Sequence, residues 1–407
     1  RPPRSTLFPY TTLFRSYYIV NWKNDGEKIK NFAGSSVPNE KYYFKSGLCW
    51  SDIVSSVLID IRPLPEGVIF SDSTLALFAE TPKIESRLMG FINSSLSAFL
   101  LLTLDPTMHH RKPGYIAQLP VSPKLLSSSL VEELSSEINT LKHEWATGND
   151  ISTHFVKPWL LQVLQGVKSD KPTTDHPLAR KFKWSKSKNA AKLRSIRGTP
   201  QMSMQKLTEL CIEREKLFEK TLYNFQESIN EEIYSLYNVD EKNRCVIEEE
   251  LRKLGGFPES HKEKYHETVK PKITVEEHVA RLLSYYVKKV MEEDEDGIVP
   301  AEELVSKIRE HIMGDFGEDQ LQRVESEISQ ILGKSLKDWL TNDFFEFHVR
   351  SYERCPIIWQ VTSANFLPRR GSQGTFNCFL HYHKLSKDTI FKIRTRKEYL
   401  KGFLDGA

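Results

Sequence analysis

The sequence predicts an α+β protein in which a small β-rich lobe precedes a mainly α-helical region and a short mixed tail. Short β-rich runs separated by Gly and Pro occupy residues 17–81, which is typical of strands joined by tight turns. After Pro123, apolar residues recur at helical spacing over long stretches. The 407 residues include 22 Phe, 15 Tyr and 7 Trp, enough for packed cores in two or three domains of roughly 150 residues.

The expected N-terminal lobe covers residues 17–125. Its β-rich and aromatic runs predict strands at 17–22, 42–44, 53–61, 67–70 and 75–78. The apolar residues between Ile84 and Phe99 then recur at helical spacing and predict one amphipathic helix, which Pro106 ends.

Helices dominate the two regions expected to follow, residues 126–270 and residues 271–407. The apolar spacing predicts helices at 125–145, 158–167, 202–237, 275–291, 301–312 and 324–339. A mixed, aromatic-rich tail is expected from residue 344 onward.

Residues 1–16 (RPPRSTLFPYTTLFRS) resemble the read-through translation of a sequencing adapter. They contain arginines but no apolar core or small-residue cleavage site, so they do not fit a secretory signal. We expect this segment to be non-native and exclude it from the fold; the alternative is a natural N-terminal arm. Because the chain opens on Arg1 and not on Met, we expect a fragment of a longer protein.

Cysteine usage and hydropathy favour a cytoplasmic protein without a membrane partner. The five cysteines are far apart and form no Cys-x-x-Cys pair, which fits neither a disulfide framework nor a zinc ribbon. The most apolar stretch, residues 91–104, is shorter than the about 20 residues that a bilayer requires.

Charge is balanced globally but segregated locally. The 57 basic and 54 acidic residues leave a net charge of +3, which excludes a strongly basic nucleic-acid wrapper as a global description. Residues 180–197, however, contain eight cations and no acid, with aromatic residues between them. The candidate DNA-binding residues of this segment are Arg180, Lys181, Lys183, Trp184, Lys186, Lys188, Lys192, Arg194 and Arg197.

Lysine and arginine side chains neutralise phosphates and release counterions, so this segment predicts sequence-independent binding to a polyanion such as double-stranded DNA. The alternative is a solvated basic helix face. A smaller cluster, His109, His110, Arg111 and Lys112, follows the first lobe's helix and is a second candidate for DNA contact.

Catalytic and metal-binding motifs are weak. Phosphate-loop, nucleophile-elbow and His-Glu-x-x-His patterns are absent from the sequence. His381 and His383 have a spacing that can bind a metal on one face of a strand. Residues 292–303 match several positions of a calcium-binding EF-hand loop, but Glu292 is too long for the first position. A solvated acidic turn is the alternative, and we assign no metal site.

Several short motifs resemble the target-recognition domains of large adenine-specific DNA methyltransferases. They are Gly90-x-x-Asn93-Ser94, then Asp105-Pro106-Thr107 where that family usually has Asn-Pro-Thr, and the closing Ile116-Ala117-Gln118-Leu119-Pro120. The opening strands of such a domain resemble residues 17–25 and 47–51, and its following helix resembles residues 227–237. The tail patches 339–345, 354–359, 374–376, 382–385 and 393–395 are similar to the C-terminal region of the PglX-like methyltransferases of BREX phage-defence systems.

This resemblance implies the sequence-recognition portion of an adenine-N6 methyltransferase from a BREX or restriction-modification system. Such enzymes bind S-adenosylmethionine and methylate a flipped adenine through an Asn-Pro-Pro-Tyr motif. That motif is absent from this sequence, so we expect no catalytic residue and no cofactor in this fragment, with S-adenosylmethionine bound by the parent enzyme. The alternative function is a helical scaffold that docks other BREX subunits.

Overall fold

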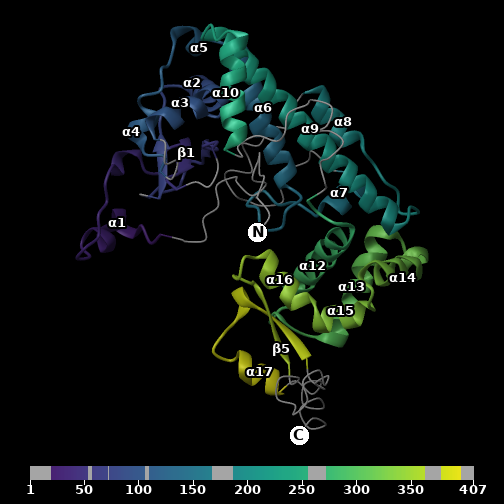
Figure 1. The fold of residues 1–407 in the computed structure, drawn as a ribbon. Coiled ribbons are helices and arrows are strands. Elements are labelled where there is room, and N and C mark those ends of the chain that lie inside the picture. Colours follow the sequence, from purple (N-terminus) through teal and green to yellow (C-terminus); the bar gives the residue numbers. More distant parts are fainter. Residues whose placement is uncertain are drawn as a thin grey trace. The chain divides into compact units, whose positions relative to one another are not determined.

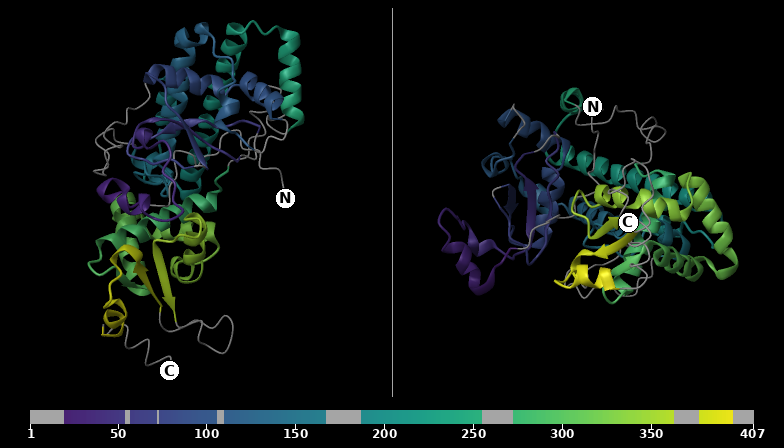
Figure 2. Two further views of the ribbon diagram at one scale, coloured as in Figure 1. Left: turned by 90° about the vertical axis from the view of Figure 1, so that its left-hand side faces the viewer. Right: turned by 90° about the horizontal axis from the view of Figure 1, so that it is seen from below.

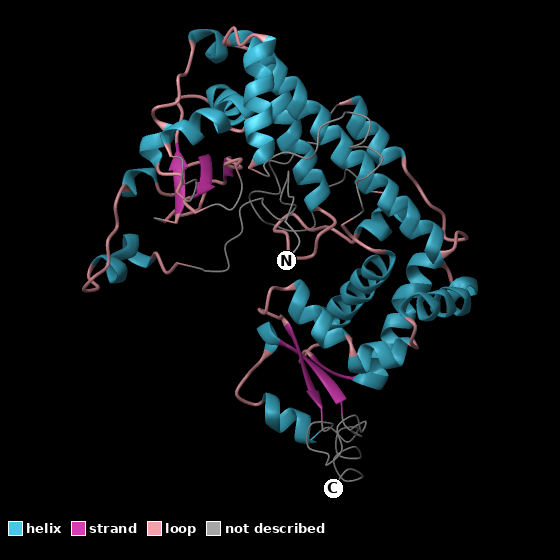
Figure 3. Ribbon diagram, in the orientation of Figure 1, coloured by secondary structure: helices cyan, strands magenta, loops and turns pink. Residues whose placement is uncertain are grey.

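The computed structural model describes residues 20–53, 57–71, 73–105, 110–166, 187–254, 272–362 and 377–395 (Figure 1). They form two compact units built from interleaved chain segments. Unit 1 draws on the described residues within 20–146, 187–191 and 216–254, and unit 2 on those within 147–166, 192–215 and 272–395. The predicted α+β class is confirmed, since helices predominate and the described residues form two small sheets (Figure 3).

Unit 1 contains an antiparallel sheet of order β2-β1-β3. The central strand β1 (Gly47–Ser51) pairs with β2 (Arg62–Leu64) through Cys49↔Arg62 and with β3 (Thr74–Leu77) through Cys49↔Ala76. Four of the five residues of β1 are buried, because the strand is covered on both faces.

Helices form most of the rest of unit 1. They are α1 (Lys23–Lys30), α2 (Pro82–Ile92), α3 (Ser95–Leu104), α4 (Pro113–Ile116), α5 (Pro123–Ser127), α6 (Ser129–Ala146) and α10 (Glu241–Lys253), with a 3-10 turn η1 (Glu40–Tyr42). Helix α9 (Met204–Leu236) supplies its C-terminal part to this unit and its N-terminal part to unit 2. The core of unit 1 gathers Trp50, Phe91, Leu125, Val131 and Ile233, each at most 1% exposed.

Most of the predicted N-terminal strands were wrong. β3 confirms the prediction at 75–78, whereas the described residues of 17–22, 42–44, 53–61 and 67–70 form no strand. Asn39, Phe44 and Asp60 have positive φ angles of 59°, 65° and 52°, which turn the backbone away from an extended path. The aromatic side chains instead pack together, as in the edge-to-face contact of Tyr43 and Phe70 at 5.3 Å.

The single helix predicted over 84–99 is two helices, α2 and α3, bent by 70°. The bend lies at Asn93 and Ser94, where the Ser94 side chain accepts a hydrogen bond from Ser97 N and caps α3. Apolar periodicity continues across this cap, which is why the spacing alone did not indicate a break. Among the described residues no single helix has the length and apolar composition to cross a membrane, and α2 and α3 pass that test only as this bent pair.

Unit 2 packs helices around a second antiparallel sheet of order β4-β6-β5, seen from two further sides in Figure 2. Its strands are β4 (Ile298–Pro300), β5 (Ile358–Thr362) and β6 (Asn377–His381). Its helices are α7 (Trp159–Gln165), α12 (Val275–Glu293), α13 (Ala301–Phe316), α14 (Leu321–Leu332), α15 (Leu336–Asn342), α16 (Phe344–Ser351) and α17 (Thr389–Thr395). Helix α8 (Lys188–Ser195) contributes its last turn, and η3 (Glu318–Gln320) and η5 (Tyr382–Lys384) are 3-10 turns.

The helices predicted at 202–237, 275–291 and 301–312 are confirmed by α9, α12 and α13. The prediction of one helix over 324–339 was wrong, because Gly333 (φ 68°) ends α14 in the left-handed conformation and Ser335 caps α15.

Candidate nucleic-acid interface

At Gly90, α2 packs closely against α6. A Cβ atom at this position would lie 2.3 Å from Ser135 Oγ and 2.7 Å from Val131 Cγ1, so only glycine fits without a shift. The glycine of the Gly-x-x-Asn-Ser motif therefore serves helix packing in this chain.

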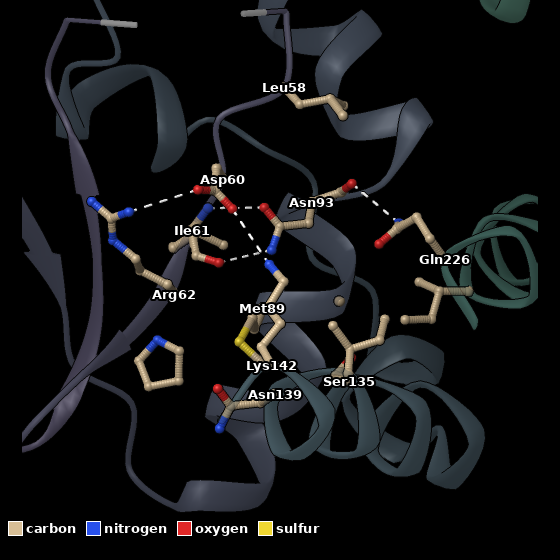
Figure 4. A pocket seen from close by; sticks show the side chains of 14 residues that line it. Leu58, Asp60, Ile61, Arg62, Met89, Asn93, Ser135, Asn139, Lys142 and Gln226 are labelled. Atoms are coloured by element: carbon tan, nitrogen blue, oxygen red, sulfur yellow. Dashed lines mark hydrogen bonds and ion pairs between the residues drawn. The ribbon is translucent and has the colours of Figure 1, made fainter. Parts of the chain in front are cut away.

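Asn93, three residues later, bonds the end of α2 to Ile61, the residue that precedes β2. Ile61 N donates to Asn93 Oδ1 at 2.9 Å, and Asn93 Nδ2 donates to Ile61 O at 2.8 Å (Figure 4). Ile61 is 2% exposed, so water does not replace these two bonds. This pair of bonds fixes the approach of β2 to α2.

The motif also meets the helical segment that resembles the family farther along the chain. Ser95 N donates to Asn230 Oδ1 at 3.0 Å, and the rings of Phe91 and Tyr237 stack with centroids 5.2 Å apart. The Tyr237 hydroxyl accepts a hydrogen bond from Ser122 N and donates one to Pro120 O. Two patches separated by more than a hundred residues are thus one packed assembly within unit 1.

A mainly apolar cavity of about 50 Å³ lies beside Asn93 (Figure 4). The Asp60 carboxylate lies 3.7 Å from the Arg62 guanidinium and 3.7 Å from the Lys142 ammonium at its wall. Gln226 Nε2 donates to Asn93 O at 3.2 Å on the α9 side. Sequence reasoning missed this cavity, although the polar residues Ser135, Asn139 and Lys142 share one face of α6 by their spacing.

The predicted loop cluster 109–112 lies against the end of β1, and Asp52 organises it. Asp52 Oδ2 accepts a bond from Lys112 Nζ at 2.6 Å and lies 3.2 Å from His110 Nδ1. The Lys112 hydrogen bond lowers the pKa of Asp52, which keeps this carboxylate ionised. The side chains of His110 and Lys112 are 49% and 52% exposed, so both present polar atoms to solvent. His109 lies outside the described residues.

Arg111 differs from its neighbours, because its side chain is only 1% exposed. Its backbone N donates to Asp52 O at 2.7 Å, its carbonyl accepts from Trp50 Nε1 at 2.7 Å, and its guanidinium donates to Val57 O at 3.3 Å. Burial lowers the pKa of Arg111, and nearby Asp105 opposes this shift. The buried guanidinium bonds the chain itself and supports the loop, and a contact of Arg111 with phosphate stays a prediction.

Only part of the basic segment 180–197 is described. Arg180, Lys181, Lys183, Trp184 and Lys186 lie outside the described residues. Lys188 and Lys192 are exposed on α8, while Arg194 on the same helix is half-buried. Arg197 donates to Gln162 O at 3.2 Å, and its guanidinium lies over Gly166, where a Cβ atom would come within 2.7 Å. Among the described cations of the segment, Lys188, Lys192 and Arg197 are exposed, and their DNA contacts stay a prediction.

The candidate metal positions in unit 2 are engaged by the protein's own donors. Asp294 Oδ1 accepts from the backbone N atoms of Asp296 and Ile298, both at 3.1 Å. Lys384 Nζ donates to the carbonyls of Glu292 and Asp294, and Lys392 pairs with Asp296. The rings of His381 and His383 are 5.6 Å apart, and no described group of three His, Cys, Asp or Glu residues could hold a metal ion.

Two of the tail patches that resemble the family, residues 339–345 and 354–359, contribute to an aromatic core in unit 2, whereas patch 374–376 lies outside the described residues. Phe344 lies against Trp339 (6.0 Å) and Phe379 (5.6 Å). His348 Nε2 accepts bonds from the backbone N atoms of Ile357 and Ile358 at 3.3 and 3.2 Å. The patches thus join α15 and α16 to the sheet, as the motifs of unit 1 join its sheet to α9.

The chain is similar in sequence to one class of known protein, the adenine-specific methyltransferases. One is the adenine-specific methyltransferase PglX of Lacticaseibacillus casei (strain Zhang), 22% identical over 421 aligned residues that cover 96% of this chain. Another is the adenine-specific methyltransferase BrxX of Escherichia coli O9:H4 (strain HS), 22% identical over 433 aligned residues that cover 93% of this chain.

The match covers 32% of each relative, so the chain spans about a third of their length. It corresponds to a C-terminal part of a PglX-like protein, as the tail patches predicted. No protein-family model matches the chain.

Proposed function

We propose that this chain is the DNA-recognition part of an adenine-specific DNA methyltransferase and that another part of the same polypeptide performs catalysis. The observation that carries the proposal is the similarity to such enzymes over 96% of the chain but only 32% of the relative. The absence of an Asn-Pro-Pro-Tyr motif from the 407 residues agrees with a non-catalytic part. In this proposal S-adenosylmethionine is bound outside this chain.

The proposed recognition lobe is residues 17–125, with the loop around Asp52 at its DNA-facing edge. One Lys112 proton bonds Asp52, and the ammonium group retains two further donors on a half-exposed side chain for a phosphate. The basic segment 180–197 adds further positive charge. Phosphate contacts position the duplex, and contacts to base edges in the major groove specify the sequence.

The biological setting is also part of the proposal. We place the parent enzyme in the bacterial cytoplasm, in a BREX phage-defence or restriction-modification system, because its motifs resemble those of PglX-like methyltransferases. Other subunits of the same system are proposed partners.

Titration of duplex DNA with the purified chain at several salt concentrations tests the DNA-binding role. Lys112→Gln removes one phosphate contact, so the slope of log K against log salt should become less steep by about 0.9. The matched control is Lys206→Gln, which removes the same charge from a lysine that is paired with Glu209 at 3.2 Å in unit 2. This control should leave the slope unchanged.

The basic segment has its own test. Replacing Lys183, Lys186 and Lys188 together by Gln should weaken binding to all DNA sequences alike and flatten the salt dependence by about 2 to 3 in the same slope. Unchanged affinity at low salt after this triple replacement would exclude the segment from the DNA interface. A chain without any salt-sensitive DNA binding would refute the proposed function.

A scaffold role is the second candidate, and the outer strand of the unit 2 sheet favours it. On the edge strand β5, Trp359 and Val361 are 44% and 36% exposed, which is unusual for large apolar side chains. A scaffold that docks other subunits would bind its partner without a salt-sensitive shift of duplex DNA. The same titration therefore separates the two functions.

A further inference from the structure

The cavity beside Asn93 has the size of a small ring. It lies within unit 1 between α2, α6, α9 and the chain that leads into β2 (Figure 4). Its volume of about 50 Å³ corresponds to roughly three to five ordered waters, which together occupy about 90 to 150 Å³ of liquid. One six-membered ring with small substituents fits this space.

The walls suit the faces of a flat, uncharged molecule. Apolar side chains from four elements line the cavity: Leu58, Met89, Ile138 and Ile229. The charged groups at the wall face one another, since Asp60 lies 3.7 Å from both Arg62 and Lys142. A charged ligand would have to give up its hydration against mostly apolar walls, so the lining favours a neutral one.

A buried polar group supplies an independent sign of a ligand. The Ser135 side chain lines the cavity and is 2% exposed, yet its hydroxyl has no hydrogen-bond partner among the described residues. Buried hydroxyl groups are usually bonded, so this one calls for a partner inside the cavity. Asn139, one turn along α6, and Gln226 from α9 also line the cavity and carry amide groups. Hydroxyl and amide groups together offer both donors and acceptors.

We propose that this cavity binds an uncharged pyrimidine-type ring, with Ser135 and Asn139 bonding its polar edge and the apolar walls covering its faces. The choice of thymine rests on the proposed function. When an adenine leaves the duplex for methylation, the thymine opposite it is left unpaired. Recognition of that orphaned base would stabilise the flipped state. The ring, donor and acceptor pattern of thymine is the chemistry the lining fits.

Saturation-transfer NMR on the full chain with thymidine tests the site without any duplex. Thymidine should show transfer to its ring protons with a Kd on the order of 1 mM, as expected for a ligand of this size, and deoxyadenosine should not. Ser135→Ala should weaken thymidine binding about three- to tenfold, the usual effect of one lost hydrogen bond. Asn139→Leu should weaken it at least as much, and its side chain is only partly buried, so this variant has little effect on folding.

Ser136→Ala is the matched control, because Ser136 is the next residue of α6, is exposed and does not line the cavity. It should bind thymidine like the unmodified chain. Absence of thymidine transfer would overturn the inference, as would equal binding by phenol, since the polar edge would then contribute nothing. Full thymidine affinity in both Ser135→Ala and Asn139→Leu would also overturn it.

The two proposals fail separately. Loss of thymidine binding in a chain that still binds duplex DNA in a salt-sensitive way overturns the pyrimidine site alone. Thymidine binding in a chain that does not bind duplex DNA supports the site and refutes the recognition function.

Discussion

Acidification should destabilise unit 2 through His348. This imidazole is fully buried between Phe344 and Tyr352, and its Nε2 accepts two backbone hydrogen bonds, which requires the neutral ring. Burial lowers the pKa of His348 from 6.5 to about 3. Between these values the unfolded chain binds a proton that the folded chain does not. The stabilisation is therefore complete above pH 6.5 and is lost as the pH falls toward 3.

The magnitude follows from these two pKa values. One pKa unit corresponds to 1.36 kcal/mol, so the free energy of unfolding should fall by about 2 kcal/mol between pH 7.5 and pH 5 through His348 alone. His278, whose pKa burial also lowers to about 3, should contribute a loss of similar size.

Urea unfolding of unit 2, followed by the fluorescence of a single retained tryptophan at Trp339, measures this loss at several pH values. His348→Gln keeps an acceptor near the Nε2 position but cannot be protonated, so its loss between pH 7.5 and pH 5 should be about 2 kcal/mol smaller. His110→Gln is the control, because its side chain is half exposed. Equal acid losses in the unmodified chain and in His348→Gln would refute the reasoning.

Three substitutions in unit 1 test the packing of the family-like motifs, each by its effect on urea unfolding. Gly90→Ala should cost about 1–3 kcal/mol, because its methyl group would lie 2.3 Å from Ser135 Oγ, whereas Gly114→Ala, with no atom within 4 Å, should be nearly neutral. Asn93→Ala should cost about 2–4 kcal/mol by leaving Ile61 N and O unpaired in the core. Tyr237→Phe should cost about 1 kcal/mol through the lost hydroxyl bonds; a neutral result would show that the Phe91 ring stack alone holds this contact.

Helical periodicity identified most of the helices, because long segments such as α9 and α12 repeat their apolar residues over several turns. Predictions failed where a local signal interrupts an unbroken apolar pattern, as at the Ser94 cap, and where a positive φ angle turns an aromatic run, as at Phe44. A helix cap or a positive φ angle involves a single residue. Composition and apolar spacing describe many residues together, so they did not predict these local features.

In the candidate site, too, some features could be predicted from the sequence and others depend on folding. The sequence indicated Lys112 as a candidate DNA contact, because a run of cations can be recognised without the fold, and this role stays a prediction. Its organiser, Asp52, lies 60 residues earlier, and the pairing of Lys112 with Asp52 exists only after folding. Arg111 belongs to the same run of cations, but folding buries it.

The sequence by itself determined the α+β class, the principal helices, the balanced net charge and the resemblance to adenine-specific methyltransferases. Only the tertiary structure decided what the shared motifs do: Gly90, Asn93 and Tyr237 hold distant segments together, and Arg111 supports a loop from inside. Burial and hydrogen-bond partnership arise from contacts between residues far apart in the chain, and no local pattern contains those contacts.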